Sequence, residues 1–89
     1  MKTEYLPAFL KDLKALIGNP VYDKVKRLAF ETLPAISNLN EVRNLKRLRG
    51  ADNAYRIRVG DYRVGFIFEH DTIVFARVLN RKELYRYFP

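Results

Sequence analysis

The segment Tyr55–Phe66 constrains the fold more than any other part of the chain, because its side chains alternate along two short runs. Such alternation is typical of β-strands with one buried face. The Gly60-Asp61 pair between the two runs is typical of a two-residue hairpin loop, which would set the register of the strands. The predicted cross-strand pairs are Val59 with Tyr62, Arg58 with Arg63, and Arg56 with Gly65.

This register places three arginine side chains on one face of the hairpin, opposite the face that holds Ile57 and Val59. Like charges directly opposite each other across an antiparallel pair destabilise it by roughly 0.2 to 1 kcal/mol. Folding alone therefore does not favour the arrangement. An anionic partner would favour it, so the arginine face is the first candidate for a binding site.

At 89 residues the chain is long enough for one domain, residues 1–89, with a single modest core. Hydrophobic residues make up 48% of the chain and include six Phe and six Tyr, which favours a packed interior over disorder. The absence of cysteine excludes disulfides, thiolate catalysis and Cys-based zinc sites, and a single histidine excludes a His-rich metal cluster. We therefore expect chemistry without a metal or cofactor, or simple binding.

The formal net charge of +7 is concentrated in the second half of the chain. Residues 1–42 carry six Lys and Arg against five acidic residues, whereas residues 43–89 carry eleven against five, which gives +1 and +6. A concentrated positive field favours nucleic acid, or an acidic protein segment, as the partner. The sequence has neither a long apolar run nor a secretory signal, so we expect a cytoplasmic protein with no membrane partner.

Apolar periodicity predicts helices in the first half of the chain and strands in the second. Pro7 would start the first helix, Gly18-Asn19-Pro20 would end it, and a second helix would begin at Val21 and fray near Pro34. Other predicted elements are a strand at 2–5, a loop with one helical turn at 37–44, strands at 62–69 and 72–79, and a short terminal helix or an ordered tail at 81–88. The expected fold class is α+β, a helical hairpin packed on a small antiparallel sheet.

The predicted sheet has an apolar face, which the helices would cover, and a basic face. The apolar face would hold Ile57, Val59, Val64, Phe66, Phe68, Ile73 and Phe75. The basic face would expose Arg56, Arg58 and Arg63. Alternation directs Arg77 toward the core side instead, so we expect it to pair with Glu31 or Glu41 and to lie outside the candidate site.

Five segments, in their order and spacing along nearly the whole chain, carry a resemblance to a known family. They are Phe9–Leu13, Leu45–Gly50, Tyr55–Arg58, Gly60–Arg63 and Asn80–Tyr85. Together they resemble toxins of the RelE/ParE superfamily, which belong to bacterial type II toxin-antitoxin systems. The resemblance implies the RelE/ParE-like fold, a helical hairpin on a small sheet.

The RelE branch that the chain resembles cuts mRNA in the ribosomal A site without a metal, by attack of the ribose 2′-hydroxyl on the adjacent phosphate. Carried over position by position, the resemblance implies the site residues Arg56, Arg58, Arg63, Arg81 and Tyr85. Arginine forks grip phosphate oxygens and stabilise a pentacoordinate transition state, and Tyr85 would stack on a base or move a proton. The implied partners are a cognate antitoxin, the ribosome and mRNA.

The chain differs from many relatives in the groups that could carry protons. Strand positions that are often lysine in the active nucleases of this family are Arg56 and Arg58, and guanidinium groups keep their protons at any ordinary pH, which makes them poor bases near neutrality. Asn80 occupies a position that is often histidine. Tyr85 is then the only candidate for proton transfer at the matched positions.

Two further questions stay open at the level of sequence. The charged segment that contains Arg43, Lys46, Arg47 and Arg49 is either an RNA-binding surface or an ordinary solvated one. The alternative function is that of a ParE-like toxin, which poisons DNA gyrase through protein contacts without nuclease activity. A third is an attenuated member that retains only antitoxin and operator-complex functions.

Overall fold

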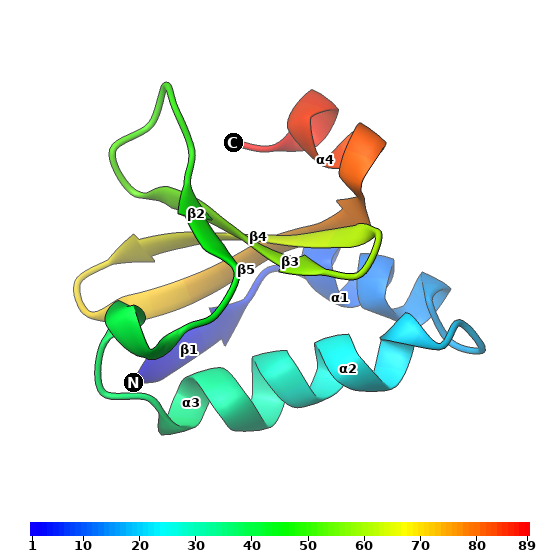
Figure 1. Ribbon diagram of the computed structural model, residues 1–89, viewed down its shortest axis with the longest axis horizontal. Coiled ribbons are helices and arrows are strands. Elements are labelled where there is room, and N and C mark those ends of the chain that lie inside the picture. Colours follow the sequence, from blue (N-terminus) through cyan, green and yellow to red (C-terminus); the bar gives the residue numbers. More distant parts are fainter.

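The computed structural model describes all 89 residues, which form a five-stranded sheet and several short helices (Figure 1). The elements in chain order are β1 Lys2–Tyr5, α1 Pro7–Ala15, α2 Val21–Arg27, the π-helical turn η1 Leu28–Thr32, α3 Leu33–Ala35, the 3-10 turn η2 Leu39–Glu41, β2 Leu45–Arg47, β3 Ala54–Val59, β4 Tyr62–Glu69, β5 Thr72–Asn80 and α4 Arg81–Tyr87. No helix has the length and apolarity that crossing a bilayer requires.

The sheet has the order β1-β5-β4-β3-β2. The β3–β4 hairpin has the predicted register, with Val59 opposite Tyr62 and Arg58 opposite Arg63. The α+β prediction is confirmed, and the sheet differs from the expected one at its two edges. At one edge β1 pairs with β5 in parallel, and at the other the charged segment contributes a short antiparallel strand, β2.

Figure 1 shows the helices α1, α2 and α3 on one face of the sheet and α4 on the other. The larger core lies on the first of these faces, which we call the inner face. Its fully buried side chains include Phe9 and Val25 from the helices and Phe66 and Phe75 from the sheet. Burial of large apolar side chains is the main stabilising contribution in a domain of this size, so the inner face holds the fold together.

A smaller cluster lies on the opposite face, which we call the outer face. It joins Leu84 and Phe88 at the carboxyl end of the chain to Ala54 in β3, Ala76 in β5 and Leu48 after β2. This cluster packs α4 onto only part of the sheet. The rest of the outer face is left for polar side chains.

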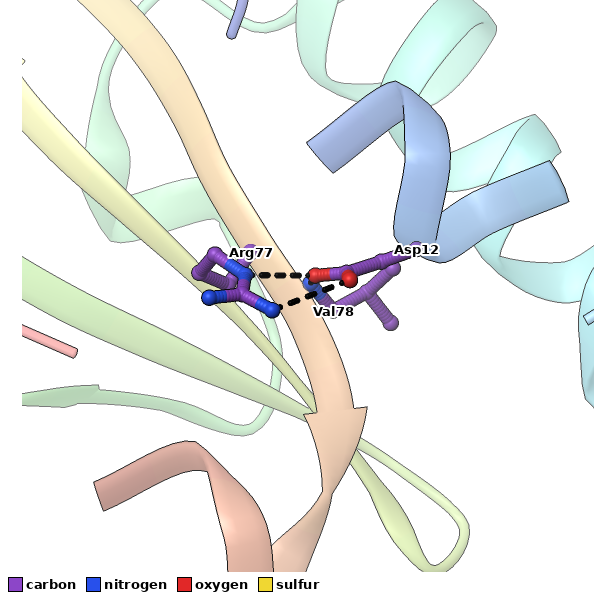
Figure 2. Close-up of polar contacts among 3 residues, drawn as sticks. All are labelled: Asp12, Arg77 and Val78. Atoms are coloured by element: carbon purple, nitrogen blue, oxygen red, sulfur yellow. Dashed lines mark hydrogen bonds and ion pairs between the residues drawn. The ribbon is translucent and has the colours of Figure 1, made fainter. Parts of the chain in front are cut away.

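The prediction for Arg77 is wrong, because its partner is Asp12 of α1 (Figure 2). Arg77 Nε and Nη2 donate to the two carboxylate oxygens at 2.7 and 3.1 Å, and the Val78 N–H donates to the same carboxylate at 3.1 Å. These hydrogen bonds to Asp12 raise the pKa of Arg77 above its ordinary value. The β4–β5 register shifts next to Arg77, between Gly65 and Phe66. Simple alternation therefore does not give the direction of this side chain.

Asp12 also satisfies a backbone donor of β5 at the point where β1 no longer pairs with that strand. β1 pairs with β5 only as far as Tyr5 opposite Phe75, after which the chain enters α1. The Asp12 carboxylate accepts from the Val78 N–H beyond the end of that pairing. An unpaired backbone donor at a partly buried edge would cost free energy, so this carboxylate has a structural role.

Candidate functional site

The outer face of the sheet carries a cluster of cations from three neighbouring strands. Arg58 of β3 lies opposite Arg63 of β4, and Arg56 of β3 lies opposite Gly65 of β4. On the other side of β3, Lys46 of β2 lies opposite Arg56. Residues directly opposite each other in an antiparallel pair have Cβ atoms about 4.5–5.5 Å apart on one face, so these four cations share one surface.

Asn44, which precedes β2, holds the two arginines of β3. Its backbone carbonyl accepts from Arg56 Nη1 at 2.8 Å and from the Arg58 N–H at 3.1 Å, and its side-chain oxygen accepts from Arg58 Nη2 at 3.2 Å. Asn44 has a φ of 61°, in the left-handed region that Asn tolerates better than most residues. Sequence reasoning missed this residue, and its only signal is an Asn at the end of the loop predicted at 37–44.

The pKa of Arg63 shows how the candidate residues are arranged. Burial lowers the pKa of Arg63 below its ordinary value, and the charges of Arg56, Arg58 and Arg81 lower it further, whereas Tyr85 raises it. The charges of the three other arginines that the resemblance implied therefore reach Arg63, which agrees with the pairing of Arg58 with Arg63 across the hairpin. The Arg63 side chain is fixed by hydrogen bonds from Nη1 to the carbonyl oxygens of Gly60 and Tyr62, both at 3.0 Å.

Helix α4 brings Arg81 and Tyr85 to this face. The Arg81 N–H donates to the Asp61 carbonyl at 2.8 Å, which ties the start of the helix to the β3–β4 turn. Asn80 caps the helix, because its side-chain oxygen accepts from the Lys82 N–H at 3.0 Å. Arg81 and Tyr85 are four residues apart and so lie on the same side of α4. Asn80 thus has a structural role at the start of α4.

Phe88, which follows α4, packs directly against Gly65 of β4. A Cβ atom added to Gly65 would lie 2.6 Å from Phe88 Cδ2, far inside any normal contact distance. Gly65 is therefore required because the Phe88 ring lies directly on the β4 backbone. Tyr85 remains 55% exposed, so it is not one of the residues that dock the helix. Its ring is available to a ligand.

Tyr85 borders a surface depression of about 430 Å³. The other lining residues are Lys46, Arg47, Leu48, Arg49, Phe88 and Pro89. The structure therefore brings three of the four residues of the charged segment next to Tyr85. The β2–β3 loop and α4 both rise from the outer face in Figure 1, on either side of the sheet surface between them.

Two residues of the charged segment are placed differently from Lys46. Arg47 lies opposite Tyr55, whose ring packs on the inner-face core, and Arg47 Nη2 lies 3.7 Å from Asp52 Oδ1 in an exposed ion pair. Arg43 borders a separate cleft of about 480 Å³ between the segment Lys24–Ile36 and β3. Arg43 and the depression next to Tyr85 are therefore parts of different surfaces.

The chemistry of the outer face is that of an anion site. No group of three or more His, Cys, Asp or Glu side chains is arranged to hold a metal ion. No acidic residue lines the depression next to Tyr85. One donor, Arg56 Nε, is buried without a hydrogen-bond partner, although such groups are nearly always paired. Clustered guanidinium groups of this kind bind phosphate and stabilise additional negative charge on it.

Comparison with known proteins identifies close relatives of the chain. A family model described as the ParE toxin of type II toxin-antitoxin system, parDE, matches residues 3–85. The chain is also 42% identical to Toxin RelE3 of Methanocaldococcus jannaschii over 90 residues, which cover 100% of both chains.

Solved structures give the same result for the fold. A chain of a RelB-RelE antitoxin-toxin complex from Methanococcus jannaschii is 38% identical, with a TM-score of 0.77 over 97% of this chain and 99% of that one. A chain of the DinJ-YafQ complex from E. coli has a TM-score of 0.75 at 18% identity, over 94% of this chain and 97% of that one. The second likeness shows the fold alone.

Proposed function

Because the chain belongs to the RelE/ParE superfamily of toxins of type II toxin-antitoxin systems, we propose that it inhibits translation by cleaving mRNA on the ribosome. One observation carries the proposal. Arg56, Arg58 and Arg63 share the outer face of the β3–β4 hairpin, and α4, which is tied to the β3–β4 turn, adds Arg81 and the exposed Tyr85. A surface of clustered guanidinium groups with one exposed tyrosine matches the needs of phosphodiester cleavage.

In the proposed reaction the ribose 2′-oxygen attacks the adjacent phosphorus, and the bond between phosphorus and the 5′-oxygen breaks. Negative charge develops on the nonbridging oxygens in the transition state. Arg56, Arg58 and Arg63 would bind these oxygens from the sheet, and Arg81 would bind them from α4. A preorganised donor that stabilises a developing oxyanion contributes roughly 10²–10³ in rate.

Tyr85 would act on the nucleotide rather than on the phosphate charge. Its ring is more than half exposed, next to the cations and above an apolar floor that includes Leu48 and Phe88. Stacking of a base on an aromatic side chain contributes about 1–3 kcal/mol and tolerates different sequences. Tyr85 would therefore orient the nucleotide or assist proton transfer.

We also propose that a cognate antitoxin neutralises the protein. The RelB-RelE and DinJ-YafQ structures are complexes of an antitoxin with a toxin. On this chain the net charge of +6 in residues 43–89 would attract an acidic or amphipathic segment. Such a segment would lie across the outer face or displace α4, which packs on the sheet through a small apolar cluster.

A second candidate function is the inhibition of DNA gyrase without cleavage of RNA. Two observations favour it: the matching family model is that of ParE toxins, and no lysine occupies the matched positions of β3. In this case the outer face would contact protein.

Brief induction of the protein in a bacterial host, with mapping of mRNA ends, tests the proposal. One reporter message is compared with a copy that lacks the start codon and is not translated. Cleavage of the translated copy alone is the expected result. Growth arrest with intact mRNA would move the assignment to gyrase, and the absence of any arrest would indicate an attenuated member of the family.

A further inference from the structure

The pairing of β2 with β3 places Lys46 beside the arginines of the outer face, a location that the sequence alone does not indicate. Lys46 pairs with Arg56 across β2 and β3, so their side chains leave the same face of the sheet. The neighbours of Lys46 in the chain agree with this placement, since Leu45 packs against the inner-face core and Leu48 belongs to the outer-face cluster. Lys46 is therefore the lysine on the arginine face.

The surroundings of Lys46 leave its ammonium group available. The side chain is exposed, and it takes part in no ion pair or side-chain hydrogen bond of the structure. Lys46 and Tyr85 line the same depression of about 430 Å³, and no acidic residue borders it. A lysine with an acidic neighbour is usually a structural partner, whereas this one faces only cations, apolar side chains and a tyrosine.

Cleavage by 2′-hydroxyl attack needs a proton that the arginines do not supply. As the bond from phosphorus to the 5′-oxygen breaks, its electron pair passes to the 5′-oxygen, and an alkoxide is a poor leaving group until it is protonated. Arginine retains its protons at any ordinary pH, whereas a lysine ammonium is a compact donor and a stronger acid than a guanidinium, so it can give a proton to an alkoxide, which is a far stronger base than an amine.

We propose that Lys46 is the general acid of the site and donates a proton from its ammonium group to the departing 5′-oxygen. The 2′-oxygen–phosphorus bond forms, the phosphorus–5′-oxygen bond breaks, and the proton of the 2′-hydroxyl passes to water. The products are a 2′,3′-cyclic phosphate and a 5′-hydroxyl, and neutral Lys46 regains its proton from water. This inference rests on the proposed ribonuclease function and adds to it the group that protonates the leaving oxygen.

The test combines Lys46→Arg with a change of leaving group. Lys46→Arg keeps the positive charge and the donors but has no proton to transfer near neutrality. Lys2→Arg is the matched control, because Lys2 is exposed on β1 at the opposite edge of the sheet. Each protein is mixed in excess with ribosomes that carry a synthetic message. The messages have either the natural 5′-oxygen or a bridging 5′-sulfur at each phosphodiester of the A-site codon.

A thiol has a pKa of about 8.5, so a thiolate leaves without help from an acid. The expected result is that Lys46→Arg cleaves the oxygen message about 10²–10⁴-fold more slowly than the unmodified protein. On the sulfur message it should match the unmodified protein within a few fold. Lys2→Arg should match the unmodified protein on both messages.

Two results would overturn the role of Lys46 while leaving the proposed function intact. One is full activity of Lys46→Arg on the oxygen message, and the other is an equal loss on both messages, which would assign Lys46 to binding. If the unmodified protein cleaves neither message, the proposed function fails and the role of Lys46 fails with it. Equal thermal unfolding midpoints of the variants exclude misfolding as the cause of a loss.

Discussion

The two faces of the sheet are built from the same strands, yet they differ in what their side chains contribute. On the inner face, Ile57, Val64 and Phe66 are nearly or fully buried against the helices. On the outer face, the alternate residues of the same strands include Arg56 and Arg63, and only a small cluster under α4 is apolar. A sheet that is stabilised from one side is free to place like charges on the other. The inner face therefore specifies the fold, and the outer face is available for function.

The largest expected effect comes from emptying the centre of the inner face. Phe75→Ala removes a fully buried ring that lies near Tyr5, Phe9 and Phe66, and should lower the free energy of unfolding by about 3–5 kcal/mol. Urea denaturation measures this change in the free energy of unfolding. Phe30→Ala is the control, because that ring is 40% exposed and its loss should cost much less. Equal losses would contradict the assignment of stability to the inner face.

Arg63→Ala and Arg81→Ala should reduce activity without reducing stability, the reverse of what is expected for Phe75→Ala. Each should abolish toxicity and reduce mRNA cleavage by roughly 10²–10³ while leaving the protein folded, because each removes one donor to the phosphate. Arg86→Ala is the matched control on α4, since Arg86 is exposed and pairs with Glu83 at 3.4 Å. Growth assays and circular dichroism measure the two properties. Retained toxicity in both variants would rule out the phosphate site.

A smaller effect is expected where α4 meets the outer face. Gly65→Ala would force a Cβ atom against the Phe88 ring, an overpacking that should cost about 1–3 kcal/mol. Hydrogen exchange should show faster opening of α4 than of β3. In a Phe88→Ala background the same Gly65 substitution should cost clearly less. An equal cost in both backgrounds would mean that Gly65 is required for another reason.

The smallest effect is expected at Asn44. Its side chain accepts a hydrogen bond from Arg58, and its backbone adopts a left-handed conformation. Asn44→Gly removes the side-chain acceptor of Arg58 and tolerates the positive φ, so stability should change by less than about 1 kcal/mol while cleavage falls a few fold. Asn44→Ala should lower cleavage to the same extent. It should also lose about 1–2 kcal/mol of stability to left-handed strain. If Asn44→Gly cleaved at the unmodified rate, the side chain would have no part in positioning Arg58.

The inner face could be predicted from sequence because its signals are local. Alternation around Gly60-Asp61 determined the hairpin register, and the same alternation gave the arginine face. The edges could not be predicted in this way. β2 is only three residues long, and its charged residues are equally typical of a solvated surface segment. The pairing of Lys46 with Arg56 was therefore not predicted.

The contacts that shape the outer face and the sheet edge join residues that are distant in the sequence, so no local sequence pattern predicts them. Arg77 pairs with Asp12, 65 residues away, because the register of β4 and β5 shifts next to Arg77. The contact between Gly65 and Phe88 depends on how α4 packs, and the support from Asn44 depends on a backbone angle. The roles of Arg56, Arg58, Arg63, Arg81 and Tyr85 in catalysis stay predictions, although all five belong to the β3–β4 hairpin or to the helix α4 on its outer face.

The most direct test of the account is a purified reaction of the protein with programmed ribosomes and one defined mRNA. The account predicts cleavage within the A-site codon of ribosome-bound message, with 2′,3′-cyclic phosphate and 5′-hydroxyl ends, and no such cleavage of the free message. Arg63→Ala, folded and added at the same concentration, should leave the bound message intact. Intact message in the presence of the unmodified protein, together with loss of supercoiling by purified gyrase, would contradict the account.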